Sequence, residues 1–365
     1  MRTGPIVYYI TAHGYGHGVR SADILNAIAR LAPSVDTVVV STLDPAFLRS
    51  RLDHTPREFR SRALDVGMVQ LDSVRLDVER SRRAAAGLLD RWDELVVQER
   101  AFHDAVDASV VVADIPAIPI EAAASAGRPA IAVGNFAWDW IYEPYAESDS
   151  RWSPIVERFR RGYGRADLLL RLPFSEPMAV FPICEDLPLL STPVPSRRDD
   201  LARHAGADAG KRWTLISFTT LEWGAEALDR VEAIPGTEFF SVLPLVWPGR
   251  RIHAIDRRRF SFAEVLASVD AVVSKPGYGI VSECIAAGKP LLHASRRDFR
   301  EYPILVDAIE RYLRQRAISE ERLYSGDLGR DLEHLFQAPV PRETMPAGGA
   351  DRAARRILDL ARADL

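Results

Sequence analysis

Two histidines lie within one short, glycine-rich segment near the start of the chain, Thr11–Gly18 (TAHGYGHG). A β-branched run, Ile6–Ile10, precedes this segment and a helical pattern follows it, so both imidazoles are predicted to follow the end of a strand. An imidazole changes charge near neutral pH and can take a proton from a hydroxyl group. We therefore take His17 as the candidate general base, and as further candidates for substrate contact we take His13, Gly14 and Gly16.

The same segment has two other interpretations. One histidine can simply cap backbone groups, or both can bind a metal. Two histidines alone are few ligands for a metal site, and the sequence has no Asp-x-Asp at a strand end. We therefore expect neither a bound metal nor a cofactor.

A carboxylate ends a second β-branched run, Val110–Asp114 (VVVAD). Parallel strands end at the same edge of a sheet, so Asp114 is predicted to lie close to His17. A carboxylate beside an imidazole fixes its tautomer and stabilises the imidazolium that forms. The alternative role for Asp114 is the N-cap of the helix near Ile118.

A glycine turn, Ser274–Gly279 (SKPGYG), joins the strand Ala271–Ser274 to a short helix. Backbone N–H groups and the dipole at such a helix start favour an anion, for example a pyrophosphate. Glu283, one turn later, is placed to accept hydrogen bonds from ribose hydroxyls. The alternative is a tight turn that needs glycine for its dihedrals. The candidate ligand contacts at this turn and helix are Gly277, Tyr278, Gly279, Ser282 and Glu283.

An aromatic segment, Gly134–Tyr145 (GNFAWDWIYEPY), follows another strand. Its rings can stack on a sugar or form an ordinary core cluster. The candidates that we assign here to the cleft are Asn135, Trp138 and Asp139.

The elements that must position these residues alternate between short β-branched runs and helical patterns. That alternation predicts an α/β chain with two doubly wound, Rossmann-like parallel-sheet domains. The halves echo each other, because Gly127-Arg128-Pro129 and Gly288-Lys289-Pro290 each end a helix before a strand. We expect an N-terminal Rossmann-like domain over 1–180, a proline-rich linker over 181–200, a C-terminal Rossmann-like domain over 201–345 and a C-terminal helix over 346–365 that packs on the first domain.

The bulk composition excludes several classes of protein. The chain of 365 residues has a net charge of −4, so it lacks the broad basic field that nucleic acid requires. It has two cysteines and no apolar stretch of the roughly 18 residues that span a membrane. We expect a cytoplasmic protein, and peripheral membrane contact stays open.

The segment Ser274–Pro290 (SKPGYGIVSECIAAGKP) resembles the donor-binding segment of GT-B glycosyltransferases. The resemblance extends to the enzyme that adds N-acetylglucosamine to the peptidoglycan lipid precursor, to plant galactolipid synthases and, through Gly134–Tyr145 especially, to the glycosyltransferase-like half of L-arabinokinase. It implies two domains facing a central cleft, with the glycines of the turn on the diphosphate and Glu283 on the ribose. In Arg297–Pro303 (RDFREYP) it implies donor-sugar contacts at Asp298 and Glu301, and it implies a base at His17 with Asp114 as its partner.

One segment departs from the family. Ser217–Thr220 (SFTT) stands where many relatives have glycines close to the donor phosphates. Thr219 is our candidate for a phosphate contact there, although a degenerate site would also account for the change.

From these features we expect an inverting, metal-independent glycosyltransferase. It would move a sugar from a nucleotide-diphosphate sugar, with uridine assumed from the resemblance, to a hydroxyl of an unidentified small molecule, lipid or glycan. The alternatives are a nucleotide-sugar-binding module without transfer and a nucleotide-sugar epimerase of the same fold.

Overall fold

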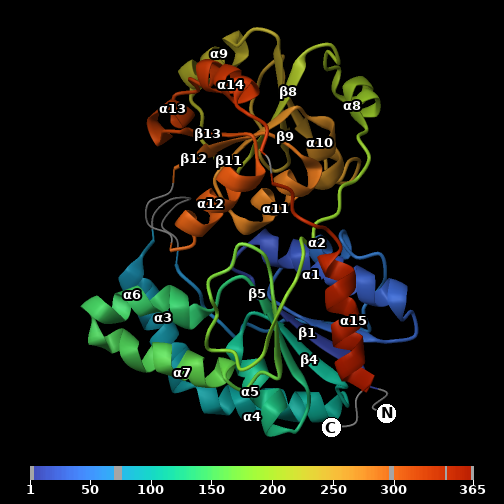
Figure 1. Cartoon of the computed structure of the whole chain (residues 1–365), viewed down its shortest axis with the longest axis vertical. Coiled ribbons are helices and arrows are strands. Elements are labelled where there is room, and N and C mark those ends of the chain that lie inside the picture. The colour runs from blue at the N-terminus through green and yellow to red at the C-terminus, as the bar shows by residue number, and fades with distance from the viewer. Residues whose placement is uncertain (1–3, 70–75, 296–299, 342, 363–365) are drawn as a thin grey trace. The chain divides into compact units, whose positions relative to one another are not determined.

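A computed structural model describes residues 4–69, 76–295, 300–341 and 343–362 (Figure 1). The chain divides into two compact units. Unit 1 comprises Met1–Ser191 and Ala347–Leu365, and unit 2 comprises Thr192–Pro346. In the described part of the chain, no helix has the length and apolar character needed to cross a bilayer.

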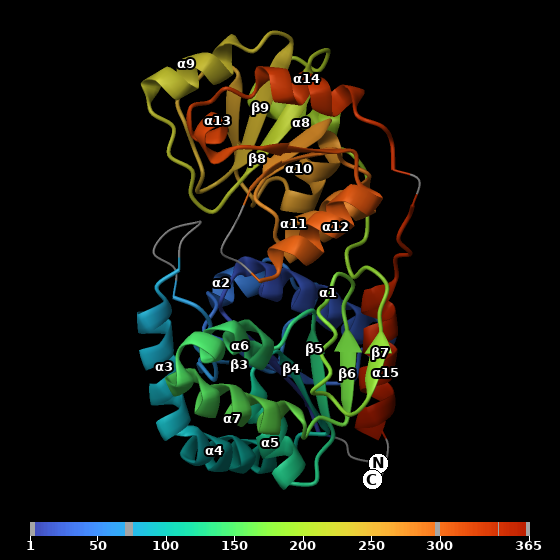
Figure 2. The same cartoon turned by 60° about the vertical axis from the view of Figure 1, so that its left-hand side comes forward.

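Unit 1 is built on a parallel sheet of seven strands in the order β3-β2-β1-β4-β5-β6-β7. Its central strands are almost wholly buried, which is why they read as continuous apolar runs. Figure 2 shows β5, β6 and β7 side by side at one edge. The strands are β1 (Ile6–Ile10), β2 (Thr37–Val40), β3 (Glu58–Arg60), β4 (Val110–Asp114), β5 (Ala130–Gly134), β6 (Leu168–Arg171) and β7 (Cys184–Asp186).

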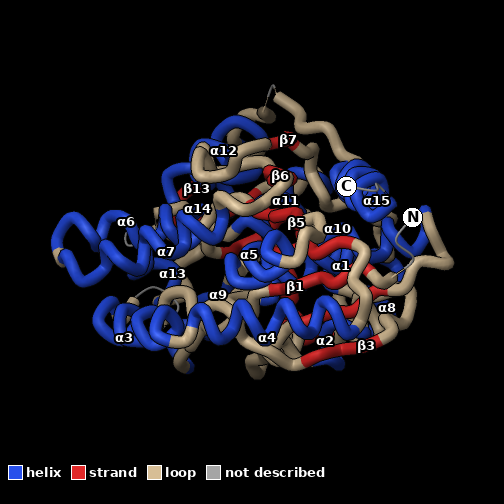
Figure 3. Tube along the Cα trace, turned by 90° about the horizontal axis from the view of Figure 1, so that it is seen from below, coloured by secondary structure: helices blue, strands red, loops and turns tan. Residues whose placement is uncertain are grey.

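Helices flank the strands of unit 1 (Figure 3). Alternate strand residues such as Val7, Tyr9 and Val111 form one core with α4, α5 and α7. The final helix, α15, packs against α1 and β4 and thereby returns the end of the chain to this unit. The helices are α1 (Tyr15–Leu31), α2 (Pro45–Arg49), α3 (Val78–Asp90), α4 (Trp92–Ala105), α5 (Ala117–Ser125), α6 (Trp138–Ser148), α7 (Ser153–Tyr163) and α15 (Gly349–Arg362), with a 3₁₀ turn at Ser150–Trp152.

Unit 2 has a parallel sheet of six strands in the order β10-β9-β8-β11-β12-β13. Ser261 and Glu264 have the spacing that predicts a capping box, and the structure contains this box at the start of α10. The strands are β8 (Arg212–Ser217), β9 (Thr237–Val242), β10 (Ile252–Ile255), β11 (Ala271–Ser274), β12 (Leu291–Ala294) and β13 (Gln315–Ile318). The helices are α8 (Arg198–Ala205), α9 (Ala225–Ala233), α10 (Phe262–Ser268), α11 (Tyr278–Ala287), α12 (Tyr302–Tyr312), α13 (Glu320–Tyr324) and α14 (Gly329–Gln337).

The prediction of two doubly wound, Rossmann-like parallel-sheet domains is confirmed. The matching helix ends are confirmed as well, because Gly127 and Gly288 both have left-handed dihedrals, with φ of 59° and 61°.

Two helix boundaries differ from the prediction. The helical period of the apolar residues near 84–106 predicts one long helix, but the structure has two, α3 and α4, separated at Arg91. The apolar period runs through the break, so the sequence pattern does not reveal it. The apolar period predicts that the first helix begins near Val19, but α1 begins at Tyr15 and includes Gly16 and Gly18. At Gly18 a Cβ would stand 2.8 Å from Phe47 and 2.9 Å from Leu43, so glycine allows this close packing.

Candidate functional site

His17 and Asp114 meet at the carboxyl edge of the unit 1 sheet. Neighbouring parallel strands β1 and β4 pair Ile10 with Asp114, and α1 places His17 in its first turn. His17 Nδ1 lies 2.8 Å from Asp114 Oδ1. The predicted proximity is therefore confirmed, while the catalytic role of the pair stays a prediction. The alternative role as an N-cap is wrong, because α5 begins at Ala117 after Pro116 and has no side-chain cap.

Arg20 joins this pair, which the sequence reasoning missed. Its Nε donates to Asp114 Oδ2 at 2.7 Å and its Nη2 donates to Oδ1 at 2.5 Å. Nη2 also lies 2.9 Å from His17 Nδ1. The spacing of three residues between His17 and Arg20 places both on one face of α1, and this was the signal that could have identified Arg20.

The position of Arg20 sets the charge of the site. Burial alone would raise the pKa of Asp114, but the charges of Arg20 and His17 outweigh it and hold that pKa well below its usual range. Burial and the Arg20 charge lower the pKa of His17, and the opposing effect of Asp114 does not cancel them. The imidazole is therefore neutral at neutral pH, as a general base must be.

The aromatic segment mostly forms core. Trp138 and Tyr142 are buried in α6 and belong to the unit 1 core cluster, as the alternative interpretation held. Asn135 is buried and accepts a hydrogen bond from Arg20 Nη1 at 2.7 Å. Asp139 is buried with Arg160 Nε at 3.4 Å, and burial raises its pKa.

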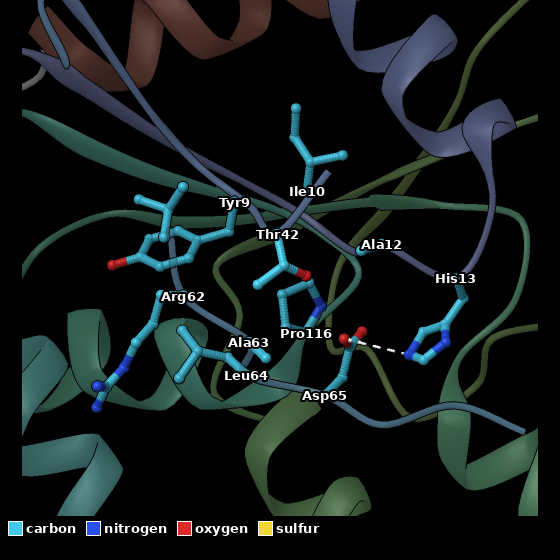
Figure 4. A pocket seen from close by; sticks show the side chains of 11 residues that line it. Tyr9, Ile10, Ala12, His13, Thr42, Arg62, Ala63, Leu64, Asp65 and Pro116 are labelled. Atoms are coloured by element: carbon cyan, nitrogen blue, oxygen red, sulfur yellow. Dashed lines mark ion pairs between the residues drawn. The ribbon is translucent and has the colours of Figure 1, made fainter. Parts of the chain in front are cut away.

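His13 lines a pocket at the carboxyl ends of the first strands of unit 1 (Figure 4). Its Nε2 lies 3.4 Å from Oδ1 of Asp65, in the segment after β3. Asp65 was not anticipated, because β3 is a three-residue edge strand with no clear period-two pattern. Gly14, the N-cap of α1, and Gly16 both have open space where a Cβ would stand.

The candidate donor residues gather at the carboxyl edge of the unit 2 sheet. β8, β11 and β12 are neighbours, and each is followed at this edge by part of the predicted set. Ser274 at the end of β11 donates from Oγ to the Ser217 carbonyl at the end of β8, at 2.6 Å. Thr219 is exposed after β8, Glu301 is the N-cap of α12, and α11 carries Tyr278, Gly279, Ser282 and Glu283. Asp298 lies outside the described residues.

Gly277 separates the two interpretations of the glycine turn. It is the N-cap of α11 with a φ of −151°, an extended conformation that any residue adopts. A Cβ built on Gly277 would meet no atom within 4 Å. The explanation by backbone dihedrals is therefore wrong for Gly277. What glycine provides here is open space beside the start of a helix, where an anion binds favourably.

The helix α11 contains one further buried polar group. The Oγ of Ser282 is buried without a hydrogen-bond partner among the described residues. In the same described part of the chain, no group of three or more His, Cys, Asp or Glu residues is arranged to hold a metal ion.

One known protein resembles this chain in sequence over most of the chain's length. No protein-family model matches the chain. The L-arabinokinase of Arabidopsis thaliana is 26% identical over 321 residues and is a distant homologue. The match covers 84% of this chain but only 29% of the length of L-arabinokinase.

Solved structures with the same fold match nearly the whole chain. A UDP-glucosyltransferase from Polygonum tinctorium, capable of glucosylating indoxyl, has a TM-score of 0.60 at 14% identity and covers 99% of both chains. A protein assigned as a UDP-N-acetylglucosamine 2-epimerase from Listeria monocytogenes has a TM-score of 0.56 at 14% identity, over 97% of this chain and 95% of that one. The chain has the GT-B glycosyltransferase fold.

Proposed function

We propose that the chain is an inverting glycosyltransferase that transfers a sugar from a nucleotide-diphosphate sugar to an acceptor hydroxyl. The contact between His17 and Asp114 carries this proposal, because it joins a neutral imidazole to an ionised carboxylate at the ligand-binding edge of a GT-B unit. UDP is the proposed nucleotide, since the comparable structures include a UDP-glucosyltransferase.

The proposed reaction begins with His17. In the proposed tautomer, Nδ1–H donates to Asp114, which only accepts hydrogen bonds, and Nε2 keeps its lone pair. Arg20, which only donates, then bonds to Asp114 rather than to Nδ1. Nε2 takes the proton of the acceptor hydroxyl as the oxygen attacks the anomeric carbon of the donor. The new glycosidic bond forms as the bond to the diphosphate breaks, which inverts the configuration. Asp114 stabilises the imidazolium that results.

Unit 2 holds the donor in this proposal. The diphosphate lies on the open backbone at Gly277, where the dipole of α11 stabilises the charge that develops on the leaving group. Glu283, partly exposed on α11, accepts hydrogen bonds from the ribose. Thr219 donates to a phosphate oxygen from the exposed segment after β8. The leaving group is stabilised by these protein groups, so the reaction as proposed uses no metal.

The test compares His17→Ala with the unchanged protein on a panel of nucleotide-diphosphate sugars. Binding of the donor is followed by thermal shift, because a ligand that binds the folded state raises Tm. Hydrolysis and transfer are followed by release of the nucleotide diphosphate. We expect His17→Ala to keep the thermal shift and to lose about 10²–10⁴-fold in turnover. Equal turnover in both proteins, or no shift with any donor, contradicts the proposal.

A second candidate is supported by the epimerase of the same fold. An epimerase interconverts the free nucleotide-sugar without an acceptor, so incubation of the donor alone followed by separation of its epimers distinguishes it. A module that only binds would shift Tm with a donor and show neither reaction.

A further inference from the structure

The pocket beside His13 is separate from the contact between His17 and Asp114 and has a chemistry of its own. It lies at the carboxyl ends of β1 and β2 and against the segment after β3, and holds about 390 Å³ of empty space, part of it open to solvent. Figure 4 shows His13 and Asp65 turned toward one another at one side of the pocket, with Thr42 and Pro116 nearby.

Asp65 is a buried carboxylate with unused hydrogen-bonding capacity. Its Oδ2 accepts from Trp138 Nε1 at 3.0 Å. Among the described residues no lysine or arginine lies within 4.0 Å of it, and His13 is its sole ion-pair partner there. A buried carboxylate without a strong cation depends on hydrogen-bond donors, and Oδ1 is placed to receive one from the pocket.

His13 presents the complementary atom. Its Nε2 lies 3.4 Å from Asp65 Oδ1 but makes no hydrogen bond in the described structure. The ring is held in place from two sides. It packs edge-on against Trp138 with centroids 5.0 Å apart, and Gly67, with a φ of 54°, lies so close that a Cβ there would stand 2.4 Å from the imidazole. The pair is therefore preorganised rather than mobile.

A hydroxyl group fits this pair better than other ligand groups do. It can donate to Asp65 Oδ1 and accept from His13 Nε2–H at the same time. An ammonium only donates, and it would meet the positive charge of Arg62 on the same pocket wall. An apolar group would leave both atoms without partners.

We propose that this pocket selects a small polyhydroxylated ligand, a sugar or polyol, with one hydroxyl bridging His13 Nε2 and Asp65 Oδ1. Its identification as the acceptor side of the reaction rests on the proposed function, whereas the binding of a polyol does not. In this assignment His13 and Asp65 contact the ligand and determine specificity, and the proton transfer belongs to His17.

The experiment uses three ligands with the same six-membered carbon ring: myo-inositol, cyclohexanol and cyclohexylamine. Saturation-transfer NMR on the full chain measures the binding of each to the unchanged protein, Asp65→Asn and His13→Ala. Asp65→Asn can still accept from Trp138 but loses the acceptor that faces the pocket. The matched control is His253→Gln, which alters another histidine–carboxylate pair: the partly buried His253 lies 2.8 Å from the buried Glu238 in unit 2.

We expect myo-inositol to bind in preference to the other two ligands. Asp65→Asn and His13→Ala should each weaken it at least about tenfold, since a hydrogen bond to a charged group is lost, and His253→Gln should leave it unchanged. Preference for cyclohexanol or cyclohexylamine, no binding of myo-inositol, or equal binding by the variants overturns the inference. Melting curves show whether each variant is folded, and His13→Gln, which keeps an N–H donor, serves if His13→Ala is not.

These experiments distinguish a failure of the polyol-pocket proposal from a failure of the transferase proposal. If UDP-glucose is bound and turned over while myo-inositol does not bind, the polyol pocket is wrong and the transferase proposal stands. If myo-inositol binds and depends on Asp65 while no nucleotide-sugar binds, the transferase proposal is wrong and the pocket stands.

Discussion

The guanidinium of Arg20 lies 2.9 Å from Nδ1 of His17, the same nitrogen that faces Asp114 at 2.8 Å. The imidazole therefore has a permanent cation and a permanent anion beside one atom. Burial and the charge of Arg20 lower the pKa of His17, and the charge of Asp114, which raises it, does not cancel them. A base in this environment is weak, but it stays unprotonated to a lower pH than a free imidazole does.

Replacing Arg20 should move the acidic limb of the pH–rate profile. A base must be unprotonated to act, so activity falls as the pH drops through the His17 pKa, which lies below 6.5. In Arg20→Met the pKa of His17 rises, so the acidic limb moves to higher pH. Arg20→Lys keeps the positive charge, so its acidic limb should stay at the pH seen for the unchanged protein. Turnover measured across pH with a responsive donor checks this, and a limb that stays in place in Arg20→Met contradicts it.

Arg20→Met should also destabilise unit 1, because the buried charge of Asp114 loses its cation and keeps only the contacts with the neutral His17 and with Ser21. Removing one member of a buried pair costs about 3–5 kcal/mol. The double variant Arg20→Met with Asp114→Asn should recover much of this loss, since both charges are gone. Urea unfolding of the unchanged protein, Arg20→Met, Asp114→Asn and the double variant gives the comparison, and additive effects of the two changes would contradict the coupling.

Gly277→Ala should separate donor binding from stability. Its φ of −151° and the open space around it predict a stability change within about 0.5 kcal/mol. We expect the new methyl group to occupy space used by the diphosphate and to reduce the thermal shift with UDP. Gly288→Ala is the matched control at the other end of α11. Its φ of 61° predicts a loss of about 1 kcal/mol with UDP binding kept.

Acidification should destabilise the folded protein through His103. It is buried beside Tyr9, whose hydroxyl lies 2.8 Å from Nε2, and burial lowers its pKa to about 3. The unfolded state binds a proton near pH 6.5 and the folded state does not, so this contribution is present above pH 6.5 and is lost as pH falls toward 3. The limiting slope is about 1.4 kcal/mol for each pH unit.

Urea unfolding at a series of pH values measures that slope. In His103→Gln the dependence between pH 6.5 and 4.5 should flatten by about one proton, while Asp114 and Asp65, whose pKa values are lowered, contribute at lower pH. An unchanged slope would show that His103 does not titrate on unfolding.

Gly67→Ala should disturb His13 without changing its chemistry. The new Cβ would stand 2.4 Å from the imidazole, and the backbone at φ 54° is strained for alanine. Gly127→Ala is the control for strain alone, because its φ is 59° and nothing lies within 4 Å of its Cβ position. We expect the backbone strain to lower the free energy of unfolding of both variants by about 1 kcal/mol. Only Gly67→Ala should lose further stability and bind myo-inositol more weakly. Equal losses in unfolding and unchanged binding would contradict the close packing.

Much of the fold could be predicted because its signals are local. Buried parallel strands are continuous β-branched runs, and helix ends carry glycine and proline, so β1, β4, β11 and the echo of Gly127 and Gly288 were evident from short windows. The edge strands β3, β7 and β13 were not, since partly exposed strands of three or four residues carry little pattern.

From the sequence alone, Asp114 at the end of one strand could be expected to meet His17, which follows the end of another, because parallel pairing brings strand ends to one edge of the sheet. It also placed a glycine at the start of α11, although only the dihedrals showed that the backbone did not require it. The tertiary structure alone decided that Arg20 shares the carboxylate of Asp114 and that Asp65 faces His13. Those contacts join segments that are far apart in the sequence, where no helical or strand period relates one segment to the other. Their geometry follows from how the surrounding core packs.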